Sequence, residues 1–491
     1  MTDATATLQA VEDVLRSADL LVETDGPRDL ALGGVAQDSR LVEAGDLFLA
    51  WKGTGTDAHD FVPMALDRGA AAAVVERRVA VALPQVVVTN GRRAAALAAD
   101  VVMGSPSLEM LTVGVTGTNG KTTTSLLVRH LLEPDFYTAV VGTLGLVDRD
   151  GVRPGTEGLT TPGPVQVAVW LRDLADGGTG AVVLEASSHA LEQHRLDGVA
   201  FDIVVFTNLS QEHLDYHQDM GGYRLAKTRL VELVEPAGTV IVNRDDSAWD
   251  SLDVGGRPLR TFALDADADL TASNIEGDPL GTRFTLSIDG HEHRVTTPLV
   301  GRYNVSNSLA ALTVALAAGI DVGHCIERLA SAPQVTGRLE AIVTEPFTVL
   351  IDFAHTPAAL EGALAAVRPF TPGRLIVLFG AGGDRDATKR RPMAEAVAKL
   401  ADVVVITSDN PRTEDPEAIL DDLAKGVGST DHLRFVDRRE AIRAALEAAR
   451  PGDTVVLAGK GHETYQVVGT EKRPFDERSI VLDALRDMGA A

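Results

Sequence analysis

The order of apolar and polar positions along the chain predicts an α/β fold. Apolar runs of about five residues, the length of a buried strand, alternate with longer segments of helical spacing. Two of these runs lie at residues 181–184 and 201–206, in the middle of the chain. Strands that alternate with helices in this way form parallel sheets covered on both faces. The pattern therefore predicts a doubly wound parallel sheet in the central part of the chain.

A second group of apolar runs predicts another doubly wound sheet near the C-terminus. These runs are separated by helical patterns and lie at residues 349–352, 375–379, 403–406 and 454–457. The remaining pattern predicts strands at 71–75 and 86–88, helices at 125–132 and 308–318, and a β-hairpin with strands at 284–288 and 291–296.

Two linkers divide the chain. Ser105-Pro106-Ser107 has the composition of a connection between domains, and residues 332–340 resemble a linker that contains a hinge. A length of 491 residues is enough for about three domains. We predict domains at residues 1–108, 109–333 and 334–491.

The amino-acid composition excludes several classes of function. The net charge of −25 argues against nonspecific binding to nucleic acid. The single cysteine, Cys325, excludes an intrachain disulfide. The N-terminus lacks the basic and apolar regions of a signal peptide, and the longest apolar segment, residues 309–320, is too short to span a bilayer. We therefore expect a soluble, cytoplasmic monomer with no nucleic-acid partner and no membrane insertion.

Residues 112–124 have the layout of a nucleotide phosphate loop. An apolar run is followed by a glycine-rich turn, and Gly120-Lys121-Thr122 then leads into a helical pattern. Lys121 would reach the β- and γ-phosphates, and the hydroxyl of Thr122 would ligate Mg²⁺. Val115 stands where the strict Walker spacing needs glycine. The alternative is an ordinary glycine turn before a helix.

Polar clusters follow both central strands, at residues 185–195 and 207–217. Ligands of open α/β sheets bind at the carboxyl ends of the strands, so these clusters lie where a site is expected. Their carboxylate, imidazole and hydroxyl groups suit Mg²⁺ held by few protein groups together with phosphate. Solvated loop residues are the alternative.

Each of the C-terminal strands is also followed by a polar motif. One such motif is weak evidence, but motifs after every strand of one sheet favour an active site over chance. The motifs lie at residues 352–357, 382–386, 408–415 and 459–463.

The loop sequence T-G-T-N-G-K-T-T at residues 116–123 resembles the ATP loop of the Mur ligases and of the related folylpolyglutamate synthases. The resemblance to the Mur ligases covers nearly the whole chain, with all three domains in order. It implies a P-loop-type central sheet, a Rossmann-like C-terminal sheet that binds an amino acid, and a smaller N-terminal α/β domain that binds UDP.

The resemblance also implies an activity. The expected reaction is ATP-dependent amide ligation, in which meso-diaminopimelate is added to UDP-N-acetylmuramoyl-L-alanyl-D-glutamate through an acyl phosphate. The co-substrate would be ATP and the cofactor Mg²⁺. The residues that this resemblance makes catalytic are Lys121, Glu185, His213 and Lys227.

The same resemblance assigns binding residues in four groups. The ATP group is Gly117, Thr118, Asn119, Gly120, Lys121, Thr122, Thr123, Asn304, Asn307, Arg338, Asp352 and His355. The group for the UDP-sugar dipeptide is Gln37, Ser39, Thr160, Thr161, Ser187, Gln193 and Arg195, with residues 54–56 beside it. The diaminopimelate group is Arg385, Asp409, Asn410, Pro411, Arg412, Gly459 and Glu463. The metal group is Thr122, Glu185, His213 and Lys227, the last as a carbamate formed from CO₂.

Several of these residues have a plain alternative. From spacing alone, Lys227 is an exposed helical lysine, and Ser39 belongs to a surface turn. Asn304 could cap the helix that follows, or Asn307 could lie in its first turn. Arg412 could pair with an acidic residue of its own turn, at position 414 or 415.

The chain also departs from the family at three places. Thr54-Gly55 replaces a usual His-Gln pair, Glu212 replaces aspartate, and Phe353 replaces tyrosine.

Three other functions remain open. A lysine-adding ligase of the same fold would lack an arginine aimed at a distal carboxylate. A folylpolyglutamate-type ligase would lack the N-terminal domain of roughly 100 residues. A non-catalytic, ATP-gated binding protein could have lost Glu185, His213 or Lys227, all of which are present.

Overall fold

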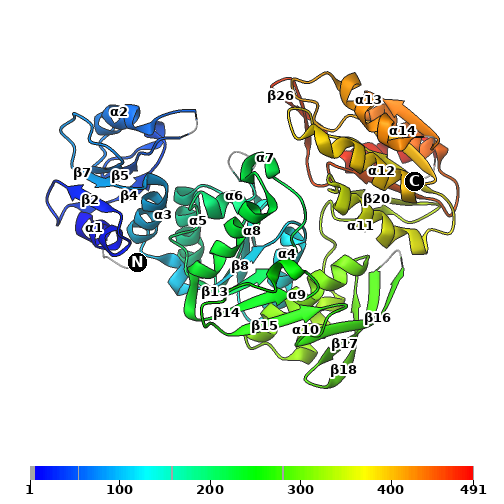
Figure 1. The fold of residues 1–491 in the computed structure, drawn as a ribbon, viewed down its shortest axis with the longest axis horizontal. Helices are drawn as coiled ribbons and strands as arrows, with labels where there is room; N and C mark the ends of the chain where they lie inside the picture. The colour runs from blue at the N-terminus through cyan, green and yellow to red at the C-terminus, as the bar shows by residue number, and fades with distance from the viewer. Residues whose placement is uncertain (1–5, 54, 156–158, 279–280, 429, 490–491) are drawn as a thin grey trace.

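The computed structural model describes residues 6–53, 55–155, 159–278, 281–428 and 430–489. Figure 1 shows three α/β regions, with the N-terminal region in blue, the central region mainly in green and the C-terminal region in yellow to red. Their main sheets have five, eleven and six strands. The predicted α/β fold class is confirmed, while the boundaries at residues 108 and 333 stay predictions. No helix in the described ranges combines the length and the apolar character needed to cross a membrane.

The N-terminal sheet has the strand order β2-β7-β6-β5-β4, with β2 antiparallel to the rest. Helices α1 and α3 pack on one face and α2 on the other. The two strands predicted here are confirmed as β6 and β7. The elements are α1 Leu8–Ser17, β2 Leu21–Thr24, β4 Gly34–Ala36, β5 Asp46–Leu49, α2 Val62–Asp67, β6 Ala72–Val75, β7 Gln85–Val88 and α3 Gly91–Val102.

The central sheet has the order β11-β10-β9-β12-β8-β13-β14-β15-β16-β17-β18. Strands β9 to β16 in this order run parallel, and antiparallel strands extend both edges. The predicted hairpin is confirmed as β17 and β18. The strands are β8 Leu111–Thr116, β9 Thr138–Gly142, β10 Gly145–Asp148, β11 Gly151–Arg153, β12 Ala181–Glu185, β13 Phe201–Phe206, β14 Val234–Asn243, β15 Leu259–Ala263, β16 Leu270–Asp278, β17 Gly281–Ile288 and β18 His291–Thr297.

Helices cover both faces of the parallel part of this sheet. Helices α4, α9 and α10 bury one face, and α5 and α6 bury the other. Strand β8 lies between β12 and β13, so the loop that follows it opens at the middle of the sheet. The helices are α4 Lys121–Leu132, α5 Pro164–Asp176, α6 Ser188–Glu192, α7 Leu214–His217, α8 Met220–Thr228, α9 Arg302–Ala317 and α10 Val322–Ala330.

Helix α9 begins six residues earlier than the predicted helix 308–318, at Arg302. Gly301 turns the chain into the helix with a φ of 100°. Asn304 therefore lies inside the helix instead of capping it, and its amide donates to the carbonyl of Val300 at 2.8 Å. Asn307 lies in the second turn, not the first. The expected positions of Asn304 as a cap and of Asn307 in the first turn were wrong. The first turn of α9 is polar, so the apolar pattern begins only after the helix has started.

The C-terminal sheet has the order β19-β20-β24-β21-β22-β23, and all strands from β20 to β23 in this order are parallel. The four predicted strands are confirmed. The elements are β19 Glu340–Val343, β20 Thr348–Asp352, α11 Pro357–Val367, β21 Leu375–Phe379, α12 Arg390–Leu400, β22 Val403–Thr407, α13 Pro416–Val427, β23 His432–Phe435, α14 Arg438–Ala448, β24 Thr454–Ala458, β25 Tyr465–Val468, β26 Glu471–Pro474 and α15 Glu477–Asp487.

The linker between the central and C-terminal regions is anchored on both sides. Val335 belongs to the core of the central sheet. Two positions later, Gly337 accepts a hydrogen bond from the amide of Phe353 at 2.9 Å. A Cβ on Gly337 would lie 2.3 Å from the amide nitrogen of His462, so the linker fits closely against the C-terminal region. Only Thr336 lies between the two anchors, which makes it the candidate hinge.

Candidate active site

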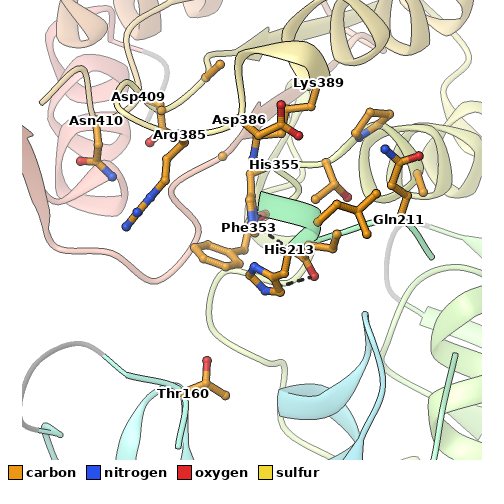
Figure 2. Close-up of a pocket in the computed structure, with 18 of the residues that line it drawn as sticks. Thr160, Gln211, His213, Phe353, His355, Arg385, Asp386, Lys389, Asp409 and Asn410 are labelled. Carbon is orange, nitrogen blue, oxygen red and sulfur yellow. Dashed lines mark hydrogen bonds and ion pairs between the residues drawn. The ribbon is translucent and has the colours of Figure 1, made fainter. Parts of the chain in front are cut away.

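A cleft of about 700 Å³ lies between the central and C-terminal regions (Figure 2). The central region contributes Thr160, Ser187, Arg195, Glu212 and His213, among others. The C-terminal region contributes groups predicted to bind an amino acid, namely Arg385, Asp409, Asn410, Arg412, Gly459 and Glu463. Residues that are far apart in sequence thus face one space, which is of a size typical for ligand sites.

A second cavity of about 230 Å³ adjoins the cleft. Phe353, His355 and Ala358 line both spaces, so the two are neighbours. Of the predicted ATP residues, the second cavity is lined by Asn119, Gly120, Thr122, Thr123, Asn307, Arg338, Asp352 and His355. The structure therefore brings most of the predicted nucleotide group together, directly beside the predicted amino-acid group.

The phosphate loop follows β8 and ends where α4 begins, at Lys121. Gly117 has a φ of 146°, and a Cβ there would lie 1.9 Å from the hydroxyl oxygen of Thr207. Gly120 has a φ of 88°, and a Cβ there would lie 2.4 Å from the side-chain oxygen of Asn307. Glycine is therefore required at both positions, and Asn307 supports the loop from α9.

Two lysines meet at the carbonyl oxygen of Gly117. The ammonium group of Lys121 donates to this oxygen and to the carbonyl of Thr118, both at 2.9 Å. The ammonium group of Lys227 donates to the same Gly117 oxygen at 2.8 Å. Two like charges this close are unfavourable unless an anion joins them or one amine loses its proton.

Lys227 is buried on the inner face of α8, with 1% of its surface exposed. The interpretation of Lys227 as an exposed helical lysine was therefore wrong. Its Nζ lies 4.5 Å from the centre of the Tyr223 ring. Burial, and then the charge of Lys121, hold the pKa of Lys227 well below its ordinary value. Both effects disfavour the charged form of Lys227.

Glu185, at the end of β12, is oriented by three donor groups. The hydroxyl of Thr122 donates to Oε2 at 3.0 Å. The amide and the hydroxyl of Thr143 donate to Oε1 and Oε2 at 3.1 and 3.0 Å. Sequence analysis missed Thr143 because no motif surrounds it. Glu185 and Thr122 nevertheless lie together, as the resemblance implied.

His213 lies in a left-handed turn with a φ of 56°, at the start of α7. Its Nε2 is 3.7 Å from Glu212, and the same carboxylate is 3.7 Å from Nε2 of His355, across the cleft (Figure 2). Burial raises the pKa of Glu212, but His355, His213 and Lys121 outweigh it and lower this pKa well below its ordinary value. Glu212 therefore stays a carboxylate that links the two regions.

No group of three or more histidine, cysteine or acidic side chains is placed to hold a metal ion in the described part of the chain. Mg²⁺ usually takes one or two carboxylates and completes its shell with phosphate and water. Glu185 and Thr122 supply one carboxylate and one hydroxyl at 3.0 Å from each other. The donor set fits Mg²⁺ bound together with a nucleotide.

The side chain of Arg412 lies at the edge of the cleft, after β22. Its Nη1 donates to the carbonyls of Gly383 and Asn410, at 2.8 and 3.4 Å. Glu414 pairs instead with Arg390, at 2.6 Å. The alternative that Arg412 pairs with an acidic residue of its own turn is therefore wrong for Glu414. The hydrogen bonds of the Arg412 guanidinium to these carbonyls leave further N–H groups that can donate to a carboxylate ligand.

The predicted uridine residues lie outside both cavities. Ser39 is buried, and its hydroxyl lies 3.3 Å from the sulfur of Met64. The side chain of Gln37 reaches the central region, 3.2 Å from the position of a Cβ on Gly163. Thr54 lies outside the described residues. Closer to the cleft, the hydroxyl of Thr161 donates to the carbonyl of Glu185 at 2.6 Å.

Arg195 connects several residues predicted to hold the dipeptide. Its guanidinium donates to the carbonyl of Thr161 and to the side chain of Gln193, both at 2.8 Å. Gln193 itself does not line the cleft, although Ser187 and Arg195 do.

Two residues that sequence analysis did not assign also line the second cavity. Asn208 accepts a hydrogen bond from the amide of Asn119 at 2.9 Å and thereby fixes the phosphate loop. Tyr303 lies on α9 beside Asn307. The signal for Asn208 was its place in the polar cluster after β13, and that for Tyr303 was its place in the stretch 301–307.

Domain closure can be tested directly. Reaction would require the reacting atoms to come within roughly 3–3.5 Å, and the phosphate loop and the predicted amino-acid group lie on different regions of the chain. We expect small-angle scattering to show a smaller radius of gyration when a non-hydrolysable ATP analogue and the muramoyl dipeptide are both present. The analogue alone serves as the control. Identical profiles with and without both ligands would contradict closure.

Comparison with known proteins identifies the relatives of this chain. The description "Mur ligase family, catalytic domain" matches residues 32–108, "Mur ligase middle domain" residues 115–315, and "Mur ligase, glutamate ligase domain" residues 337–461.

Two similar sequences are UDP-N-acetylmuramoyl-L-alanyl-D-glutamate–2,6-diaminopimelate ligases. The protein from Geobacillus thermodenitrificans is 41% identical over 92% of this chain and 94% of its own length. The protein from Gloeobacter violaceus is 41% identical over 94% of this chain and 96% of its own length. A solved structure of a ligase with the same name is 32% identical, with a TM-score of 0.71 over 99% of this chain and all of that chain. These likenesses extend over nearly the full chain, and the chain belongs to the Mur ligase family.

Proposed function

We propose that the chain is an ATP-dependent amide ligase that adds meso-diaminopimelate to UDP-N-acetylmuramoyl-L-alanyl-D-glutamate. One observation carries the proposal: a phosphate loop with two converging lysines faces a neighbouring pocket that contains Arg412, Asp409 and Glu463. The relatives named above carry the same activity in their names. Such a reaction belongs to peptidoglycan precursor synthesis in the cytoplasm, and we propose a monomer there.

The chemistry explains why a phosphate site and an amine site must be neighbours. A carboxylate is a poor electrophile, so the glutamate carboxylate of the dipeptide first takes the γ-phosphoryl group of ATP. The amine then attacks the acyl phosphate, the C–N bond forms, phosphate leaves and the nitrogen loses a proton. Positioning and neutralisation of charge supply most of the catalysis. Lys121 and the loop amides neutralise the charge on the phosphates.

Mg²⁺ would be held by Thr122, Glu185, His213 and Lys227 in its carbamylated form. Bound there, it would neutralise negative charge on the transferred phosphoryl group. The contact between Thr122 and Glu185 at 3.0 Å supports this assignment. His213 lies further out, beside Glu212, and would complete the set.

Carbamylation of Lys227 accounts for its unusual surroundings. The neutral amine attacks the carbon of CO₂, forms an N–C bond and releases a proton. The product is an anion, which removes the repulsion between the two lysines at Gly117. The low pKa of Lys227, caused by burial and by Lys121, supports the supply of a neutral amine. The carbamate also turns a buried cation into a metal ligand.

The substrates would lie along the cleft. The dipeptide would contact the residues on the central side, which are Thr160, Thr161, Ser187, Gln193 and Arg195. Its uridine end would reach Gln37 and Ser39 in the N-terminal region. The amino acid would contact Arg385, Asp409, Asn410, Pro411, Arg412, Gly459 and Glu463. ATP would contact the phosphate loop, the asparagines of α9, Arg338, Asp352 and His355.

A lysine-adding ligase is the strongest rival. It is disfavoured because the guanidinium of Arg412 lines the cleft, where it donates to two carbonyl groups and could also bind the distal carboxylate that lysine lacks. A folylpolyglutamate-type ligase is disfavoured by the N-terminal five-stranded region. A non-catalytic protein is disfavoured because Lys121, Glu185 and Lys227 all lie within one site.

An amino-acid panel tests the proposed function. ATP-dependent release of phosphate is measured with the muramoyl dipeptide and, in turn, meso-diaminopimelate, L-lysine, L-glutamate or no amine. We expect release with meso-diaminopimelate only. Equal or faster release with L-lysine would assign the chain to the lysine-adding ligases instead.

Replacing Lys121 with alanine is expected to reduce turnover by roughly a hundredfold or more at saturating ATP. The change removes a preorganised positive charge from the phosphates. The measurement is the rate of ADP formation, with Lys399→Ala as a control because Lys399 lies on the surface, paired with Glu361. Turnover near that of the wild type would show that Lys121 does not contact the phosphates.

A further inference from the structure

We propose that Lys460 is a positioning residue for the amino-acid substrate, which fixes Glu463 and Asn410 at the cleft without reaching the substrate itself. The inference rests on the proposed function and adds to it the residue that orients the amine pocket. Lys460 follows β24 and has none of its surface exposed. Gly459 and Glu463 line the cleft, whereas Lys460 lies behind them.

The ammonium group of Lys460 is held by two partners. It donates to a carboxylate oxygen of Glu463, Oε2, at 2.8 Å and to the side-chain oxygen of Asn410 at 3.1 Å. Burying an ammonium group is costly unless it is paired and hydrogen-bonded, so these contacts specify one arrangement. Both partners belong to the group that the resemblance assigns to the amino acid.

These contacts also fix which way the amide of Asn410 points. Its oxygen accepts from Lys460 and from the amide of Val467, at 3.1 and 2.9 Å. Its nitrogen donates to Oε2 of Glu463 at 2.9 Å. A flip of the amide would place donors against donors, so Lys460 locks the orientation that faces the cleft.

Glu463 is left with one oxygen for a ligand. Oε2 receives both Lys460 and Asn410. Oε1 accepts no hydrogen bond from any residue that the structure describes, and the side chain is 20% exposed at the cleft. An ammonium group of the substrate can form a charge-assisted hydrogen bond with this oxygen. Lys460 therefore turns a mobile carboxylate into a preoriented acceptor.

The charge of Lys460 has a second effect, on Asp409. Burial raises the pKa of Asp409, but Lys460, followed by Arg438, outweighs it and keeps this pKa below its ordinary value. Asp409 and Glu463 both line the cleft, and Asp409 is buried. The cation behind the pocket thus favours the ionised form of Asp409.

The test distinguishes an effect on binding of the amino acid from an effect on the earlier phosphoryl transfer. Lys460→Met keeps the length of the side chain and removes its charge and its donors. Each variant is assayed twice with ATP and the muramoyl dipeptide, once with meso-diaminopimelate and once with hydroxylamine. Hydroxylamine attacks the acyl phosphate directly and gives a hydroxamate, so the second assay reports the chemistry that precedes the amino acid. Lys399→Met is the matched surface control.

We expect Lys460→Met to raise the KM for meso-diaminopimelate by roughly 10- to 100-fold, the size expected for lost hydrogen bonds to charged groups. Formation of hydroxamate and the KM for ATP should stay close to those of the wild type. Lys460→Arg keeps the charge but moves the donors, so a smaller rise in the same KM is expected. It also serves as the second variant if Lys460→Met does not fold.

Two results would overturn the inference. One is an unchanged KM for meso-diaminopimelate in the folded variants. The other is a parallel fall of hydroxamate formation, which would mean a general structural role. A double-mutant cycle with Glu463→Gln adds a check, because losses that act through Glu463 should not be additive. Failure of the proposed function would look different, since the wild type itself would then show no release of phosphate that depends on meso-diaminopimelate.

Discussion

Replacing Lys227 with alanine is expected to lower turnover by about a thousandfold, the upper range for loss of one preorganised electrostatic contact. The alanine variant can form no carbamate, so the proposed site loses the anionic group that would face Lys121 and Mg²⁺. The physical basis is the burial of Lys227 and its hydrogen bond to Gly117 at 2.8 Å. The measurement is ADP formation with all three substrates at saturation.

Chemical rescue distinguishes a carbamate from a plain structural lysine. Short-chain carboxylates such as acetate or propionate should enter the space left by the truncated side chain and restore part of the activity of Lys227→Ala. Lys227→Arg keeps a positive charge but cannot form the carbamate, so it should stay inactive and resist rescue. High activity of the unrescued alanine variant would exclude an essential carbamate. Mass spectrometry of the intact protein under CO₂ gives an independent readout.

The second large effect concerns the choice of amino acid. The wild type is expected to prefer meso-diaminopimelate over L-lysine by about 10⁴ to 10⁵ in kcat/KM. The two amino acids differ by one distal carboxylate, which a planar guanidinium can bind through two charge-assisted hydrogen bonds. Arg412 lines the cleft and donates to the carbonyls of Gly383 and Asn410. Lysine would leave this guanidinium without a carboxylate partner.

Arg412→Ala should therefore lose most of this discrimination, and the loss should fall mainly on meso-diaminopimelate. The ratio of the two kcat/KM values in wild type and variant is the measurement. Arg391→Ala is the matched control, because Arg391 lies in the same region, is exposed and pairs with Glu395. If the wild type prefers lysine, or if Arg412→Ala keeps its preference, another residue selects the substrate.

Much of the fold could be predicted because its strands are buried on both faces. Such strands appear in sequence as short, nearly continuous apolar runs, and β13 and β21 match their predicted ranges fully. The position of the candidate site could be predicted for a related reason, because polar motifs directly follow these apolar runs. The pattern of apolar runs thus predicts the sheet and the edge of the sheet at which ligands are expected to bind.

Other features could not be predicted because they depend on tertiary contacts. Lys227 has the local pattern of a surface residue, and only the packing of α8 against the phosphate loop buries it. Thr143 orients Glu185 from a neighbouring strand connection that carries no motif. The start of α9 depends on the left-handed turn at Gly301, which the polar residues after it conceal. Long-range contacts decide the first two cases, whereas a local turn sets the start of α9.

If Thr336 is the hinge, the C-terminal region rotates about a point close to the nucleotide cavity. Arg338 and Phe353 lie next to Thr336, so such a rotation would displace them little. Strand β22 lies three places across the sheet from β20, or about 14 Å away at ordinary strand spacing, and Arg412 follows it. The same rotation would move Arg412 through a longer arc. Closure about Thr336 would therefore change the amino-acid pocket more than the nucleotide cavity.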